Sequence, residues 1–199
     1  MQKIIKNLEK NGFQVIHVAT AKEACEEAKK ILKNAQSIGL GGSETVKEIG
    51  LLDWMRQEKT FHLFDQYEPG ISMEENKERR RQGMLADVFV ASSNALSESG
   101  FLINVDGSGN RTAAFSYGPK KVLLIVGKNK IVKGTEQGFK RINKIAAPKN
   151  VERLNQKALL HNKPPKYTIK NIQNVFSVIK KSDEKNRIII ILVEESLGY

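Results

Sequence analysis

Apolar residues in this chain follow two spacings, one typical of amphipathic helices and the other of buried strands. In AKEACEEAKKIL, residues 21–32, they recur at intervals of three and four, which predicts a helix. ADVFVAS, residues 86–92, carries apolar residues on both faces, as in a buried parallel sheet. Strands and helices alternate along the chain, and this alternation predicts an α/β sheet covered on both sides.

The same pattern, read with turn and capping residues, predicts the order of the elements. Helices are expected at residues 1–12, from Thr20 to about 34, 43–50 with a continuation over 51–57, 72–84, and 135–160 with a break near Pro148. Strands are expected at residues 13–19, 37–40, 60–65, 86–92, 120–127 and from 187 onward. Two β-like runs around DGSGN, within residues 100–118, predict a β-hairpin insertion.

A glycine-rich turn, SIGLGGSETVKEIG, joins a predicted strand to a predicted helix. It contains Gly39, Gly41 and Gly42, and Ser43 is a good helix N-cap. Glycines allow positive φ angles and close approach of a ligand, and free N–H groups at a helix start favour anions. The spacing fits neither a Walker P-loop nor G-x-G-x-x-G. The turn therefore indicates an anion site, with a tight turn that binds no ligand as the alternative.

Length and composition narrow the function classes. The chain has 199 residues, which fits a single domain over residues 1–199, and no apolar run is long enough for a membrane span. The cytoplasm is the expected compartment. Cys25 is the only cysteine, which excludes an intrachain disulfide and a cysteine-rich metal site. The net charge of +11 is spread along the chain without aromatic interleaving, so a nucleic-acid partner is disfavoured.

Polar residues gather after the predicted strands of the second half of the chain. In an open α/β sheet, such positions form ligand sites beyond the carboxyl ends of the strands. The same residue types also supply turn chemistry, and for Asp106 and Asn110 both interpretations stay open. The cleft is expected to bring Asp87, Asn94 and Lys130 together beside the glycine turn. The full set of residues predicted to bind a ligand is Gly39, Gly41, Gly42, Ser43, Asn94, Asn110, Arg111 and Lys130.

Four segments in the same order resemble the LUD-domain family, of the lactate-utilisation protein C type: GLGGSETVKEIGLL, ADVFVASSNALSESGFLINVDGSGNR, GPKKVLLIVGKNKIV and LVEESLGY. The resemblance implies the three-layer α/β/α sandwich, with a mostly parallel sheet, that is shared with ribose-5-phosphate isomerase, glucosamine-6-phosphate deaminase and the CoA transferases. In that wider group, the counterpart of the glycine turn holds a phosphate or a similar group.

The resemblance also implies two candidate catalytic carboxylates. Asp87 matches an aspartate that does proton chemistry in methylthioribose-phosphate isomerase. Glu98, in SESG, resembles the catalytic glutamate turn of CoA transferases. For either residue, the alternative is a helix cap or an ion-pair partner.

Two functions follow from these observations. The first is an accessory or subunit protein of lactate utilisation that binds an anionic small molecule of phosphate or CoA type. The resemblance implies iron–sulfur partner proteins that carry the electrons. Residues 155–176 lack the cysteine cluster of many relatives, and the chain is expected to hold no cofactor or metal. The alternative is a stand-alone sugar-phosphate isomerase or CoA-transferase-like enzyme. A homo-oligomer is left open by the sequence.

Overall fold

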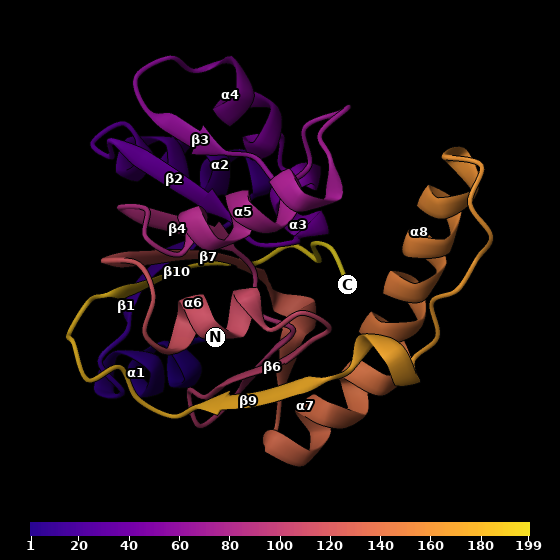
Figure 1. Cartoon of the computed structure of the whole chain (residues 1–199). Helices are drawn as coiled ribbons and strands as arrows, with labels where there is room; N and C mark the ends of the chain where they lie inside the picture. Colours follow the sequence, from indigo (N-terminus) through magenta and orange to yellow (C-terminus); the bar gives the residue numbers. More distant parts are fainter.

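A six-stranded parallel sheet forms the centre of the protein (Figure 1). The computed structural model describes all residues, 1–199. The strands run in the order β1-β10-β7-β4-β2-β3, and every neighbouring pair is parallel. Their bounds are β1 Gln14–Val18, β2 Ser37–Leu40, β3 His62–Phe64, β4 Val88–Ala91, β7 Lys121–Gly127 and β10 Ile188–Val193.

Helices cover both faces of this sheet, and alternate residues of each strand point into two separate cores. Ile189 and Ile191 of β10 pack in a core with residues of α2, α3 and α4. Ile188 and Ile190 pack on the opposite face with residues of α1 and α6. The bounds of these helices are α1 Gln2–Lys10, α2 Ala21–Leu32, α3 Glu44–Glu48, α4 Leu51–Gln57 and α6 Asn110–Ser116. The expected three-layer α/β/α arrangement is therefore confirmed.

A second, four-stranded sheet lies beside the sandwich. Its order is β8-β5-β6-β9, with β5 antiparallel to β6, β6 antiparallel to β9, and β5 parallel to β8. The bounds are β5 Ala95–Ser97, β6 Leu102–Asp106, β8 Ile131–Val132 and β9 Val175–Ile179. Gly138 of α7, Thr135–Arg141, packs this helix closely against Ile103 of β6.

The expected hairpin around DGSGN is wrong in its second half. Residues 110–116, predicted as β-like, form helix α6, because Gly109 adopts φ 80° and starts a helix instead of returning the chain as a strand. The antiparallel pair of this region is β5 with β6, one step earlier in the chain. Strand β9 was not predicted, because it is only five residues long, two of them are exposed and none is fully buried.

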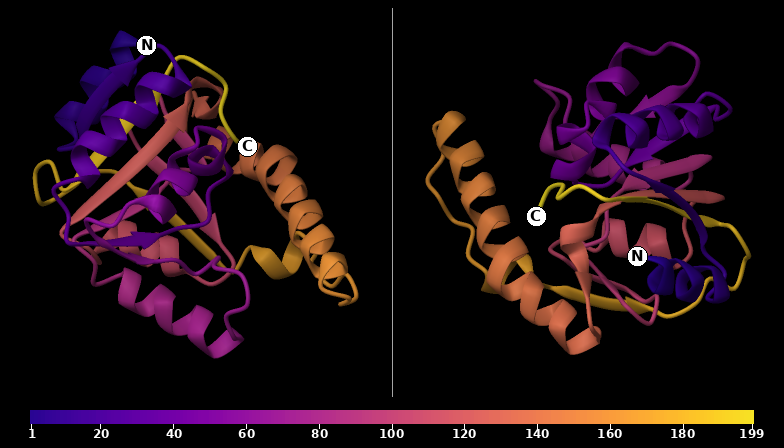
Figure 2. Two further views of the ribbon diagram at one scale, coloured as in Figure 1. Left: turned by 90° about the horizontal axis from the view of Figure 1, so that it is seen from above. Right: turned by 180° about the vertical axis from the view of Figure 1, so that it is seen from behind.

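The long carboxyl-terminal helix α8, Ala147–Leu160, projects from the body of the molecule in all three views (Figures 1 and 2). A π-helical turn over Ile142–Ala146 joins it to α7. Pro148 lies in the first turn of α8, where a missing N–H costs little. The predicted irregularity therefore lies just before the proline.

Helix α5, Met73–Gly83, packs on the same sheet face as α1 and α6. Side-chain caps begin α2, α3 and α5: Thr20, Ser43 and Ser72 each accept a hydrogen bond from the backbone N–H three residues later. Gly50, at φ 74°, separates α3 from α4, which the sequence analysis treated as one continued helix. No helix is both long enough and apolar enough to cross a membrane.

Candidate functional site

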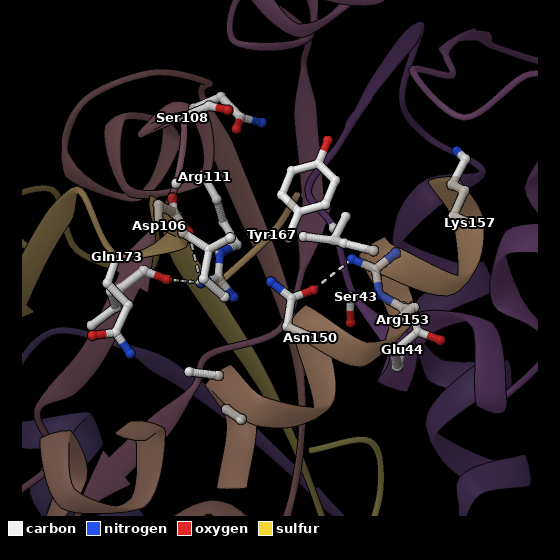
Figure 3. Close-up of a pocket in the computed structure, with 18 of the residues that line it drawn as sticks. Ser43, Glu44, Asp106, Ser108, Arg111, Asn150, Arg153, Lys157, Tyr167 and Gln173 are labelled. Carbon is white, nitrogen blue, oxygen red and sulfur yellow. Dashed lines mark hydrogen bonds and ion pairs between the residues drawn. The ribbon is translucent and has the colours of Figure 1, made fainter. Parts of the chain in front are cut away.

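A cavity of about 840 Å³ opens beyond the carboxyl ends of β2, β4 and β7. This is where parallel α/β sheets place their ligands. Three parts of the structure line it: the ends of the strands of the main sheet, residues 73–80 of α5, and α8 with the loop that follows it. Figure 3 shows side chains reaching it from both sides, with Asp106, Ser108 and Arg111 across from Glu44, Arg153 and Lys157.

The structure brings six of the ten predicted site residues to this cavity. They are Gly42, Ser43, Asn94, Asn110, Arg111 and Lys130. Gly39 and Gly41 do not line it, and neither Asp87 nor Glu98 is near it. Asn94 and Lys130 therefore share a cavity with the glycine turn, whereas the expected convergence of Asp87 with them is wrong.

Two of the three glycines of the turn, Gly39 and Gly41, serve close packing, and none of the three has a positive φ. A Cβ on Gly39 would overlap the backbone of Gly83 in α5, so this glycine lets the helix touch the sheet. A Cβ on Gly41 would lie 2.9 Å from the Ala91 side chain, and the Gly41 N–H already donates to the carbonyl of Val90. The anion-binding potential of the turn is thus restricted to its end.

Gly42 and Ser43 form that end. Neither backbone N–H donates to a group within the protein, and both residues line the cavity. A Cβ on Gly42 would lie 2.7 Å from the hydroxyl oxygen of Tyr67. This hydroxyl has no hydrogen-bond partner within the protein and also faces the cavity.

Arg111 organises the wall opposite α8. Its guanidinium donates to Asp106 at 2.9 Å, to the carbonyl of Ser92 at 3.1 Å and to the side-chain oxygen of Asn94 at 2.7 Å. The side chains of Arg111 and Asp106 are about one-tenth exposed. The Arg111 donors are mostly committed to the protein, so this residue holds the loops after β4 and β6 in place.

Lys130 is a buried lysine with no carboxylate in contact. Only 2% of the residue is exposed, and its ammonium nitrogen Nζ donates to Thr45 Oγ1 at 2.8 Å and to Ser92 Oγ at 2.9 Å. Burial, together with the guanidinium groups of Arg141 and Arg111, lowers the pKa of Lys130 to about 7. Perturbed groups of this kind in cavities are common at functional sites.

Further cationic side chains line the cavity on the side of α8, and the sequence analysis did not identify them. Arg153 donates to the Tyr199 hydroxyl at 2.9 Å and to Asn150 at 2.6 Å, and Lys157 follows one turn later. Burial, then Arg153, Lys47 and Arg80, lower the pKa of Lys157. Arg153 and Lys157 come together with Arg80 only through folding, because α5 and α8 are far apart in sequence.

The two carboxylates proposed for catalysis have structural partners elsewhere. Asp87 lies at the amino-terminal edge of β4, where it accepts hydrogen bonds from the backbone of Gln36 and Ser37. The pKa of Asp87 is lower than its usual value, chiefly because of the ion pair with Lys120. Glu98 pairs with Lys3 at 3.2 Å on the surface.

The comparisons with known proteins agree with this architecture. The sequence profile of the LUD domain matches residues 1–193. The chain belongs to the LUD domain family. This family is related to lactate-utilisation proteins.

Among solved structures, the crystal structure of a DUF162 family protein from Deinococcus radiodurans has the same fold as this LUD-domain chain. The TM-score is 0.53 and the sequence identity 17%, with 96% of this chain and 94% of that chain covered. A comparison with curated protein sequences finds no significant match.

Proposed function

We propose that this LUD-domain protein binds an anionic small molecule of phosphate or CoA type in the cavity. The observation that carries the proposal is the charge of the walls. Eight cationic residues line the cavity against two acidic ones, Glu44 and Asp106. Both carboxylates are paired with arginines, Glu44 with Arg153 at 3.5 Å and Asp106 with Arg111 at 2.7 Å. The other six cationic residues have no carboxylate partner, which favours a negatively charged ligand.

Size and lining support a ligand larger than a single phosphate. A volume of about 840 Å³ falls in the usual range for sites of small organic molecules. Tyr67, Tyr167 and Tyr199 add aromatic surface to the cationic walls. The N–H groups of Gly42 and Ser43 supply uncommitted donors at the sheet edge. A ligand with a phosphate group near the sheet and a second polar or aromatic part toward α8 would contact both walls of the cavity.

The relation of the LUD domain family to lactate-utilisation proteins supports a role for this binding in lactate utilisation. We infer an accessory or subunit role in which iron–sulfur partner proteins, which the family resemblance implies, carry the electrons. The one cysteine of this chain, Cys25, is buried in the core and cannot ligate such a cluster by itself. The stand-alone isomerase or transferase alternative is less favoured. Asp87 and Glu98 lie outside the cavity, and general-acid or general-base chemistry needs a group within hydrogen-bond reach of the reacting atom.

Replacement of Lys157 with methionine tests the cationic wall. Methionine keeps the aliphatic length but removes a charge that faces Arg153 and Arg80 without a carboxylate partner. We expect the affinity for CoA, ribose 5-phosphate or inorganic phosphate, whichever binds to the wild type in calorimetry, to fall about 5- to 50-fold, corresponding to one charge-assisted contact of about 1–2.3 kcal/mol.

Lys149→Met is the matched control, because Lys149 lies on the same helix, is exposed and does not line the cavity. Equal affinity losses in the two variants would indicate a nonspecific charge effect and contradict a site at Lys157. Failure of all three anions to bind to the wild type would contradict the proposed function itself.

Replacement of Gly42 with valine tests the sheet side of the cavity. The first side-chain carbon would meet the Tyr67 hydroxyl at 2.7 Å, and the remainder would cover the N–H groups of Gly42 and Ser43. We expect at least about a tenfold loss of affinity for a phosphorylated ligand, with a fold that is retained because the neighbouring atom is the end of a side chain. Circular dichroism checks the fold and calorimetry the affinity. Unchanged affinity in a folded variant would move the anion site away from the turn.

A further inference from the structure

The amine of Lys130 is held by two hydroxyl groups whose hydrogens are directed elsewhere. Thr45 Oγ1 donates to the carbonyl of Leu197 at 3.3 Å, and Ser92 Oγ donates to the carbonyl of Ser93 at 3.3 Å. Both oxygens therefore present lone pairs to Nζ of Lys130 and accept hydrogen bonds from it at 2.8 and 2.9 Å. A neutral amine has two N–H groups, and this arrangement satisfies both while the nitrogen lone pair stays uncommitted.

The charges around Lys130 favour the neutral amine. The guanidinium groups of Arg111 on α6 and Arg141 on α7 oppose a third positive charge. The carboxylate that faces it, Glu48 on α3, acts more weakly and accepts a hydrogen bond from the backbone N–H of Gly198. Together with burial, these groups bring the pKa of Lys130 to about 7, so roughly half of the protein carries the free amine at neutral pH.

The amine also adjoins the part of the cavity where an anion would bind. Thr45, which contacts Nζ, comes two residues after Ser43, and the N–H groups of Gly42 and Ser43 are uncommitted. Lys130 itself lines the same cavity. A small ligand whose anionic group lies at the turn would therefore hold its adjoining carbons near Nζ.

We propose that Lys130 is the nucleophile of this cavity and forms an imine with the carbonyl carbon of a small anionic aldehyde or ketone. The inference rests on the proposed function, because the cationic walls would hold the anionic group. A desolvated lysine beside other cations is one of the recognised ways to activate an amine for this chemistry.

The step conserves atoms and electrons. The lone pair of Nζ forms a bond to the carbonyl carbon, and the π electrons move to the oxygen, which takes a proton from the nitrogen to give a carbinolamine. The carbinolamine then loses its hydroxyl group with a second proton as water, and a carbon–nitrogen double bond remains. No oxidant or reductant is needed.

Reductive trapping tests this proposal. The protein is treated at pH 7 with glycolaldehyde phosphate and cyanoborohydride, which reduces an imine to a stable secondary amine, and the modified lysines are found by peptide mass spectrometry. We expect Lys130 to be labelled at least about tenfold faster than any exposed lysine, since ordinary lysines are almost wholly protonated at this pH. The rate at Lys130 should rise as pH passes through about 7 and then level off, whereas exposed lysines should gain reactivity up to their ordinary pKa near 10.4.

Three controls separate the outcomes. Lys130→Met should lose the fast label, and Lys128→Met, at an exposed neighbouring position, should keep it. Uncharged glycolaldehyde should label Lys130 more slowly than its phosphate if the walls bind the anion; equal rates would support the imine but contradict the anion site. Labels spread over exposed lysines in the wild type, with no preference for Lys130, would overturn the imine proposal. The proposed function would not fall with it, because calorimetry with phosphate tests anion binding separately.

Discussion

Arg111→Leu is expected to lower the free energy of unfolding by about 3–5 kcal/mol, because it leaves a buried carboxylate without its cation. Asp106 is 8% exposed and would keep only the hydrogen bond from the N–H of Thr112. The carbonyls of Ser92 and Val105 would lose a donor as well. For a chain of this size, the expected fall in Tm is about 2–4 °C per kcal/mol, which thermal unfolding measures.

Two further variants distinguish a charge effect from lost packing. Asp106→Asn added to Arg111→Leu removes the stranded charge and should recover part of the stability. Arg81→Leu removes the exposed ion pair between Arg81 and Glu78, whose charged atoms are 3.6 Å apart, and should lower the free energy of unfolding by less than about 1 kcal/mol. A loss in Arg111→Leu no larger than in Arg81→Leu would show that the buried pair does not hold this wall of the cavity.

Gly39→Ala is expected to destabilise the protein by at least about 3 kcal/mol, at or above the usual cost of overpacking. The added carbon would overlap the backbone carbonyl of Gly83, and a backbone atom cannot turn aside as a side chain can. Helix α5 would have to move off the sheet. Because α5 carries Arg80 to the cavity, the affinity for an anionic ligand should fall too.

Gly107→Ala is the matched control for this effect. Gly107 has no positive φ, and a Cβ there would lie 3.4 Å from the carbonyl oxygen of Ile172, an ordinary contact. We expect a change within about 1 kcal/mol, in either direction. Denaturant unfolding compares the variants, and similar losses at Gly39 and Gly107 would contradict close helix–sheet packing as the reason for Gly39.

The sequence predicted the main sheet well because its strands carry long apolar runs that are buried on both faces. β4, β7 and β10 are fully buried except for Lys121 at the start of β7, so their signal does not depend on neighbours. The second sheet was harder. β8 has two residues and β5 three, and β9 exposes Val175 and Phe176. These short or partly exposed strands owe their conformation to pairing, β8 with β5 and both β5 and β9 with β6, and β6 lies far from β9 in sequence.

The glycine turn illustrates the same difference at the site. Its three glycines indicated a backbone with close neighbours, and the structure shows that each glycine has a different neighbour. Gly39 meets a helix, Gly41 meets the neighbouring strand and Gly42 faces the cavity. A sequence pattern reports the absence of a side chain, but not what occupies the space.

By itself, the sequence determined the alternation of strands and helices, the helix caps and the presence of polar residues after strands, because these depend on neighbours a few positions apart. Tertiary structure decided which of those polar residues meet. It placed Asp87 at the far edge of the sheet and Lys130 at the cavity. It also added Arg153 and Lys157 from a helix with no distinctive motif. The physical reason is that charge and burial act through space: the low pKa of Lys130 arises from burial and from arginines on two other helices.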